Sequence, residues 1–314
     1  MHARWYNVAV VGFWLTTMGW LVTTKILPAM LLGEPPSYQT ILDARRGEPP
    51  VGWRLFWNDR PIGWALSLTE SHPSGVTEIE SRVHFDDLPI EEMTPSWARE
   101  MFRSIDRPKT SMNADSRLTF DPFGQLSSVR SVVRLGPSLD AVVFEGSVED
   151  AVLKAQVRAG SLTYATDIAI SDRTLLNDAL APQTRIHRLR LGQTWTVTTY
   201  NPFRRPTNPV EVLQAVVESV EPILVDGEAE EVFVVVYRTD AGGRLGSADA
   251  FQQRLFVRAD GTVVRQEVRL LGSTMAFARV GEEEAARLAE RVLADRFPRS
   301  ETPGDPREHG GLSP

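Results

Sequence analysis

Apolar and polar side chains alternate in a series of short runs between Val51 and Val280. In the run VTEIESRVHF, the apolar Ile79, Val83 and Phe85 share one face of an extended chain, and charged residues occupy the other face. A period of two predicts strands with one buried and one solvated face, the usual pattern of an antiparallel sheet. The same alternation recurs in residues 126–135, 151–160, 162–170, 194–200, 210–220, 231–238, 253–258 and 262–271.

Residue pairs typical of tight turns separate these runs and predict that many of the strands form hairpins. An Asp-Gly pair between two alternating runs is the strongest short-range signal of this kind. The turn pairs are Asn58-Asp59, Phe123-Gly124, Asp226-Gly227, Gly242-Gly243 and Asp260-Gly261.

Helical periodicity is confined to a few segments. Thr94-Pro95 supplies an N-cap followed by proline at the first helical position, which predicts a helix near 95–105. Three glutamates at 282–284 precede an apolar stripe of helical spacing and predict a second helix over 282–296. A third, short helix is expected over 174–180.

The fold class that follows is mainly β with a minor α component. Strands joined mainly by hairpins predict one large, strongly curved antiparallel sheet, which curls around a helix or closes on itself and so buries one face. In its first hairpin we expect two apolar sets to line the concave face. These are Trp53, Leu55 and Trp57 on the first strand, and Trp64, Leu66 and Leu68 on the second.

The first 33 residues are typical of a transmembrane anchor. Residues 5–24 contain no charge, and a helix of this length spans a bilayer core of about 30 Å. A cleaved signal peptide and a buried core helix are the alternatives, but no small-residue cleavage site follows the apolar run. A short leading tail before a large domain predicts a cytoplasmic N-terminus and a periplasmic or otherwise extracytoplasmic β domain.

The rest of the chain divides by composition. Residues 34–50 contain two Glu-Pro-Pro sequences and are expected to form a stiff, Pro-rich linker. Residues 51–297 form the predicted curved β domain. Residues 298–314, rich in proline and glycine, are expected to be a disordered tail.

Composition narrows the chemistry. The 314-residue chain has a formal net charge of −7 and no cysteine. Thiol catalysis, disulfides and thiolate metal sites are therefore excluded. An acidic chain is also a poor candidate for binding a phosphate backbone, so we expect no nucleic-acid partner.

No motif in the chain predicts catalysis. There is no G-x-S-x-G, G-x-G-x-x-G or P-loop sequence, and we expect no catalytic residue, no metal site and no cofactor. His84 with Asp86 and Asp87 is the nearest approach to a metal or acid–base corner. A solvated strand end explains this group better. A hydrolase with an unrecognised site remains a third function class.

Two sets of residues are candidates for ligand binding. The first is apolar and could line a cavity, although such residues more often fill a core. It comprises Trp53, Trp57, Trp64, Leu66, Trp97, Phe102 and Trp195. The second is basic and could hold an anionic lipid headgroup or a partner, although solvated loop charges are the simpler explanation. It comprises Arg185, Arg188, Arg190, Arg204 and Arg205.

The opening hairpin, W-x-L-x-W-N-D-R-x-I-G-W, together with LGQTWTVTTYNPF and LFVRADGTVVRQEVRL, resembles bacterial envelope domains of unknown function. These domains are similar to the LolA/LolB-like periplasmic lipoprotein carriers, and the resemblance covers about Trp53–Val280. It implies a half-barrel with helices over an apolar cavity. We therefore expect a non-enzymatic envelope protein, held at the lipid bilayer through residues 5–24. It would bind a lipid or acyl chain, or support an envelope transport or assembly complex. The alternative is a protein–protein interaction module with a filled core and no ligand.

Overall fold

A computed structural model provides the structure of the chain. It describes residues 2–23, 42, 47–88, 110–136, 139–169, 176–178, 181–186, 188–200, 210–225, 227–239, 251–270 and 273–296. Within these residues the dominant feature is one 15-stranded sheet, which confirms the mainly β fold class.

Most of the strands follow the alternating runs of the sequence. They are β1 (Val51–Trp57), β2 (Arg60–Ser71), β3 (Thr77–Leu88), β4 (Thr110–Phe120), β5 (Leu126–Leu135), β6 (Leu139–Glu149), β7 (Val152–Ala159), β8 (Leu162–Ala169), β9 (Leu176–Asp178), β10 (Thr194–Tyr200), β11 (Val210–Val225), β12 (Glu228–Thr239), β13 (Gln253–Val257), β14 (Val263–Leu270) and β15 (Ser273–Arg279).

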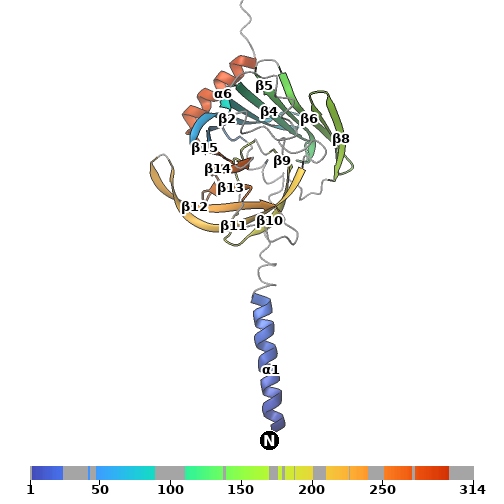
Figure 1. The fold of residues 1–314 in the computed structure, drawn as a ribbon, viewed down its shortest axis with the longest axis vertical. Coiled ribbons are helices and arrows are strands. Elements are labelled where there is room, and N and C mark those ends of the chain that lie inside the picture. The colour runs from blue at the N-terminus through green and yellow to red at the C-terminus, as the bar shows by residue number, and fades with distance from the viewer. Residues whose placement is uncertain are drawn as a thin grey trace, which may run out of the picture.

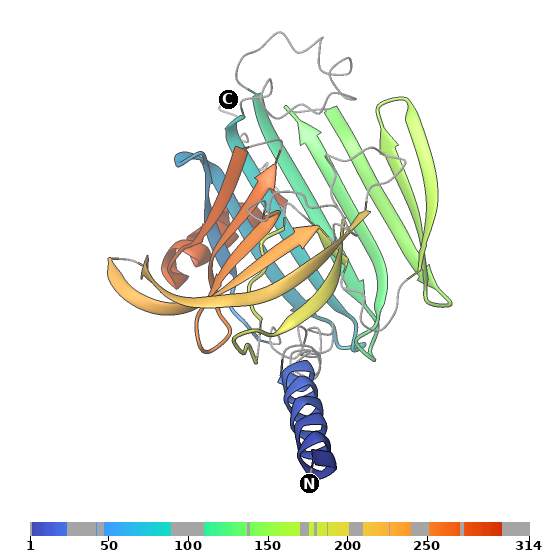
Figure 2. The ribbon, with the colours of Figure 1, turned by 60° about the horizontal axis from the view of Figure 1, so that its bottom comes forward.

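The first strand of the chain, β1, lies in the middle of the sheet. β1 pairs with both β2 and β15, and the chain runs outward strand by strand from β1 to β8. It then crosses to the opposite edge at β9 and returns strand by strand to β15. Among the described strands, every pairing is antiparallel except that of β9 with β10. The sheet is strongly curved around its interior (Figure 1), and its two edges, β8 and β9, are not paired with each other (Figure 2).

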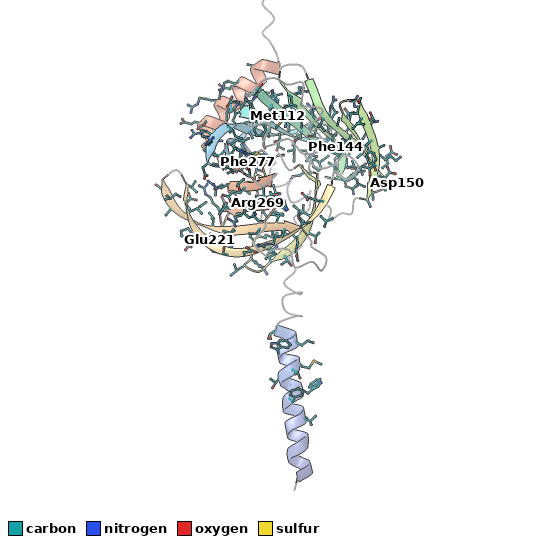
Figure 3. All side chains as sticks on the ribbon, viewed as in Figure 1. Met112, Phe144, Asp150, Glu221, Arg269 and Phe277 are labelled. Carbon is teal, nitrogen blue, oxygen red and sulfur yellow. The ribbon has the colours of Figure 1, made fainter. Side chains whose placement is uncertain are left out.

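The inner face of the sheet carries the main core. Trp53, Leu55 and Trp57 of β1 point inward, as predicted, and join buried side chains from most of the other strands. The segment 181–186 runs across the inner side, where Ile186 joins the same cluster and Thr184 accepts a backbone hydrogen bond from Val263. Phe277 and Met112, labelled in Figure 3, belong to this cluster too. Much of the interior that the curved sheet encloses is therefore packed with side chains.

The prediction that Trp64, Leu66 and Leu68 line the concave face is wrong. The turn at Asn58-Asp59 pairs Trp57 with Arg60, and an irregularity between Leu55 and Phe56 shifts the register. Ala65, not Trp64, therefore lies opposite Trp53 and shares its inner face. Trp64, Leu66 and Leu68 point to the outer face.

The helix α6 (Glu282–Arg296) covers this outer apolar patch, at the residues predicted for it. Leu288, Ala289 and Val292 pack on Leu66, with Trp64 and Leu68 at the margin. Gly52 of β1 allows this close approach, because a Cβ atom there would lie 3.1 Å from the Ala285 Cα atom and 2.8 Å from Val280 Cγ2. In Figure 1, α6 lies outside the curved sheet beside β2.

The hairpin turns are formed partly as expected. Asn58 and Asp59 both have positive φ, which matches the twist of a two-residue hairpin. The turn between β6 and β7 uses the same conformation at Asp150 and Ala151, a pair that carries no strong turn signal. The prediction of a short helix over 174–180 is wrong, since residues 176–178 form the strand β9, which pairs in parallel with β10.

The N-terminal segment forms the helix α1 (His2–Leu21), whose side chains from Val10 onward are exposed. No helix among the described residues is both long enough and apolar enough to cross a membrane. The predicted span over 5–24 is therefore not confirmed. Asparagine, glycine and threonine residues within α1 lower its mean hydropathy, and the Thr16 and Thr17 hydroxyls donate to carbonyls one turn earlier.

Two described residues of the predicted linker contact the β domain. Leu42 is buried in a second inner-face cluster with Phe120, Phe144 and Leu153. Glu48 lies near two arginines of the domain. The packed unit therefore includes residues before Val51. The helix expected near 95–105 and the tail 298–314 lie outside the described residues.

Candidate functional site

Three of the aromatic cavity candidates are part of the core. Trp53, Trp57 and Trp195 are 0%, 4% and 3% exposed in the main inner-face cluster. Trp195 meets Tyr237 edge-to-face, with ring centroids 6.1 Å apart. Side chains packed in this way on most sides fill a core and do not form the wall of a cavity. For these three residues, the geometry favours the filled-core interpretation.

The other cavity candidates are not part of the main inner-face cluster. Trp64 and Leu66 lie on the outer face, in the cluster beneath α6. Trp97 and Phe102 lie outside the described residues.

The basic candidates are not gathered into one patch in the described part of the chain. Arg185 lies beside the buried carboxylate of Glu48, with an Nε–Oε1 distance of 3.5 Å. Arg279 approaches the same oxygen at 3.6 Å and donates to the Thr184 carbonyl. Burial lowers the pKa of Arg279, and the nearby Glu48 opposes this shift. Arg185 is therefore part of an ion cluster that holds the chain before β1 against β15.

Arg188 and Arg190 are exposed in the loop before β10, where Arg188 has a left-handed backbone with φ of 58°. Arg204 and Arg205 lie outside the described residues. The predicted basic run thus divides into one arginine in an ion cluster and two exposed loop residues.

A cavity of about 320 Å³ lies on the outer face of the sheet, between α6 and the strands β2 to β5. One side of it is apolar, formed by Leu66, Leu68, Val132 and Val292. The remaining side is polar and charged. It consists of Glu80, Ser81, Arg82, Asp115, Ser116, Arg117, Arg130 and Arg134.

Sheet register explains why the charged residues meet. Leu68, Glu80, Arg117, Arg130 and Glu145 are successive register partners across β2 to β6. Directly opposite side chains on neighbouring strands share a face and are close enough to interact. This row therefore passes from an apolar end beneath α6 to a charged region over β4 and β5.

A second row runs beside the first. Leu66, Arg82, Asp115 and Val132 are register partners across β2 to β5. Arg82 Nε donates to Asp115 Oδ1 at 2.7 Å, and Arg134 pairs with the other oxygen of the same carboxylate. One aspartate thus orients two arginines at the cavity.

The first row places two positive charges side by side. Arg117 and Arg130 are directly opposite each other, an arrangement that is destabilising when it is not compensated. Arg117 pairs with Glu80, and Arg130 Nε lies 3.3 Å from Glu145 Oε1. Both arginine side chains remain at least half exposed. An anion entering the cavity would meet two accessible arginines held by acids on their far sides.

Four arginines line the cavity, and the sequence alone did not predict them as a site: Arg82, Arg117, Arg130 and Arg134. They lie on three successive strands, β3, β4 and β5, and residues 82 and 130 are separated by almost fifty positions. The available signal was an arginine on the polar face of three successive strands. This pattern shows that the arginines meet at one place only when the pairing register of the three strands is known.

His84 lies at the edge of this surface. Its Nδ1 atom is 2.7 Å from Asn113 Oδ1, and its Nε2 atom is 3.2 Å from Asp86 Oδ1. In the part of the chain that the structure describes, no three histidine or acidic side chains converge as a metal site would require. The geometry around His84 is that of a hydrogen-bonded strand end.

No protein-family model matches the chain, and no curated protein matches it. Among matching solved structures, a beta-barrel-like protein of domain of unknown function DUF1849 from Brucella abortus has a TM-score of 0.43 at 10% identity, covering 74% of this chain and 94% of that chain. A DUF1089 family protein from Pseudomonas aeruginosa has a TM-score of 0.31 at 14% identity, covering 64% and 87%. The first of these is described as a β-barrel-like protein of a domain of unknown function, and the finer resemblance to LolA and LolB is not confirmed.

Proposed function

We propose that this chain is a non-enzymatic binding protein whose β domain binds a small anionic amphiphile in the outer-face cavity. One observation carries the proposal: the cavity has an apolar side beneath α6 and two directly opposite arginines, Arg117 and Arg130, on its charged side. The binding function expected from the sequence is kept, but its site moves from the inner face to the outer face.

The apolar side suits an acyl chain. Leu66, Val132 and Val292 come from two strands and the covering helix, so they form a wall that does not depend on one element. A volume of about 320 Å³ is at the lower end of ligand pockets, which favours a single short chain over a diacyl lipid.

The charged side suits a carboxylate or phosphate group. Arginine presents a planar set of donors that matches either group, and charge-assisted hydrogen bonds are the stronger kind. Asp115 and Glu80 hold Arg82 and Arg117 in place before a ligand arrives. Such preorganisation reduces the entropy lost on binding.

The proposal includes attachment to a bilayer through the exposed helix α1, with the β domain on the extracytoplasmic side. Phe13, Trp14 and Trp20 support it, since such exposed aromatic side chains favour a lipid interface. Full-length protein should pellet with membranes, and removal of residues 1–23 should release it. Protease added to spheroplasts should then digest the β domain. Recovery of the full chain in the soluble fraction contradicts the attachment.

Calorimetric titration of the full-length protein tests the binding function. Decanoate and decyl phosphate should both bind, whereas decanol and inorganic phosphate should bind at least tenfold more weakly because each lacks one half of the amphiphile. Arg130→Gln should weaken decanoate binding about tenfold, in line with the loss of a charge-assisted hydrogen bond.

Arg158→Gln is the matched control for that titration. Arg158 lies on β7, is half exposed and shares Glu145 with Arg130, but it does not line the cavity. Its variant should bind decanoate like the wild type. The proposed site is wrong if both variants lose the same affinity, or if the wild type binds neither amphiphile.

The interaction-module function remains a second candidate, and the packed inner face favours it. If neither amphiphile binds and the protein co-purifies with a stoichiometric protein partner, this second function replaces the first.

A further inference from the structure

The strand β8 (Leu162–Ala169) forms one edge of the sheet. Its backbone pairs with β7, and the sheet described here continues no further on its other side. In both ribbon views β8 lies at the margin of the curved sheet (Figure 1, Figure 2). Unpaired N–H and C=O groups along such an edge are a template for another strand.

The side chains of β8 are also uncovered. Leu162, Tyr164, Thr166 and Ile168 continue the inner face of β7, whose Leu153, Val157 and Ala159 are buried. On β8, however, Leu162 is 58% exposed and Tyr164 is 36% exposed. The strand has no proline and no lysine, which are common protections of an edge strand.

We propose that two copies of this chain pair through β8, antiparallel, about a two-fold axis at Ala165. In this register Leu162 lies opposite the partner's Ile168, and Tyr164 lies opposite the partner's Thr166. On the other face, Thr163 lies opposite the partner's Asp167 and donates a hydrogen bond to it. Directly opposite residues share a face in an antiparallel pair, and each of these three pairs meets that requirement.

Charge supports a second copy as the occupant. Asp167 is the one residue of β8 whose side chain is charged at neutral pH. In the proposed register the two Asp167 residues are four positions apart along the strands, about 14 Å, which exceeds the Debye length at physiological salt. A register shifted to an axis at Thr166 would place Asp167 opposite Ala165 and leave the aspartate without a hydroxyl donor.

The absence of cysteine permits a direct test by disulfide trapping in the full-length chain. Ala165→Cys places two thiols opposite each other at the axis, where opposite Cα atoms are about 4.5–5.5 Å apart, so mild oxidation should give a covalent dimer. Thr163→Cys is the control on the same face. Its two thiols lie about 14 Å apart, too far to form a disulfide.

A mixture of Thr163→Cys and Asp167→Cys chains should form a mixed disulfide, because those positions face each other. Cross-linking at Thr163 in place of Ala165 overturns the register. No cross-linking at either position overturns the pairing, and another partner for the edge must then be sought.

A charge variant supplies a second measurement that needs no oxidation. Ala165→Lys places two lysines together at the axis and should lower the dimer fraction at least fivefold by light scattering at a fixed concentration. Thr163→Lys, on the same exposed face, would meet the partner's Asp167 and should retain the dimer. A monomeric wild type at high micromolar concentration, or equal effects of both variants, overturns the proposal. The amphiphile cavity lies over β2 to β5, so both outcomes are independent of ligand binding.

Discussion

Arg117 on β4 and Arg130 on β5 lie directly opposite each other on the outer face of the sheet, with Glu80 and Glu145 beyond them in the same row. Alternating acidic and basic residues in this row would have maximised attraction between neighbours. The observed order instead concentrates positive charge at the centre, next to the cavity. This arrangement predicts that substitutions of the two arginines will lower the free energy of unfolding by very different amounts.

Arg117→Gln should lower the free energy of unfolding by about 1–3 kcal/mol, because the nearly buried Glu80 loses its ion pair. Arg130→Gln should change it by less than about 0.5 kcal/mol, since Arg130 is 64% exposed and its removal relieves a like-charge contact. Urea denaturation at low and high salt measures both. If both variants lost the same free energy of unfolding, the charge arrangement described for this row would be contradicted.

The two tryptophans of the first hairpin should differ in their contribution to stability. Trp53→Ala should cost about 3–5 kcal/mol, because Trp53 is fully buried in the main cluster. Trp64→Ala should cost less than about 2 kcal/mol, since its ring lies at the margin of the α6 contact. Chemical denaturation of both variants measures these costs and so tests which tryptophan lies on the inner face of the sheet. A larger cost at Trp64 would mean that the hairpin register is wrong.

Close packing of α6 on β1 should make Gly52 sensitive to a single methyl group. Gly52→Ala should destabilise the domain by about 1–3 kcal/mol through overpacking against Val280 and Ala285. Val280→Ala removes the nearest atom and should recover part of that loss in the double variant. Thermal unfolding of the double-mutant cycle measures this coupling. Simple additivity of the two substitutions would argue against the close contact.

The ion cluster at Glu48 should be structural. Glu48→Ala leaves Arg185 and Arg279 close together and partly buried, which should cost about 3 kcal/mol. Glu284→Ala breaks the exposed pair with Arg54 and should cost less than about 1 kcal/mol. The denaturation midpoints of the two variants measure this difference in stability. Added acetate should partly restore stability in the Glu48 variant alone, because an anion can replace the missing carboxylate.

Stability should fall above about pH 10 because of Tyr237. Burial raises the pKa of this tyrosine, and a hydrogen bond with Gln183 opposes the shift in part. A raised pKa in the folded state means that the unfolded chain releases its proton first. The stabilisation is therefore complete below the unfolded pKa of about 10 and declines by about 1.4 kcal/mol for each pH unit above it. Tyr237→Phe should remove that slope in denaturation curves at pH 9, 10 and 11. An unchanged slope would contradict the assignment.

The alternation of side chains was sufficient to predict most strands and the inner face of several. Ile79, Val83 and Phe85 are buried together, as their spacing predicts. The two-residue turn at Asn58-Asp59 and the helix over 282–296 were also predicted correctly. These features depend on interactions between residues close in sequence, and local pattern contains that information.

Register could not be obtained in the same way. A shift of one residue in strand pairing reverses the face of each later side chain, and the irregularity between Leu55 and Phe56 leaves no mark in composition. Trp64 and Leu66 were consequently assigned to the inner face, although they lie under α6. The short strand β9 was missed as well, because its parallel pairing with β10 depends on a crossover from the far edge of the sheet.

By itself the sequence determined a mainly β domain with hairpins and a C-terminal helix, because period-two hydrophobicity and turn chemistry are local properties. Only the tertiary structure decided where the sheet begins, which face α6 covers, and that Arg82, Arg117, Arg130 and Arg134 surround one cavity. These depend on pairing between strands distant in the chain. Such pairing is chosen by the total burial and hydrogen bonding of the whole sheet, which no single segment specifies.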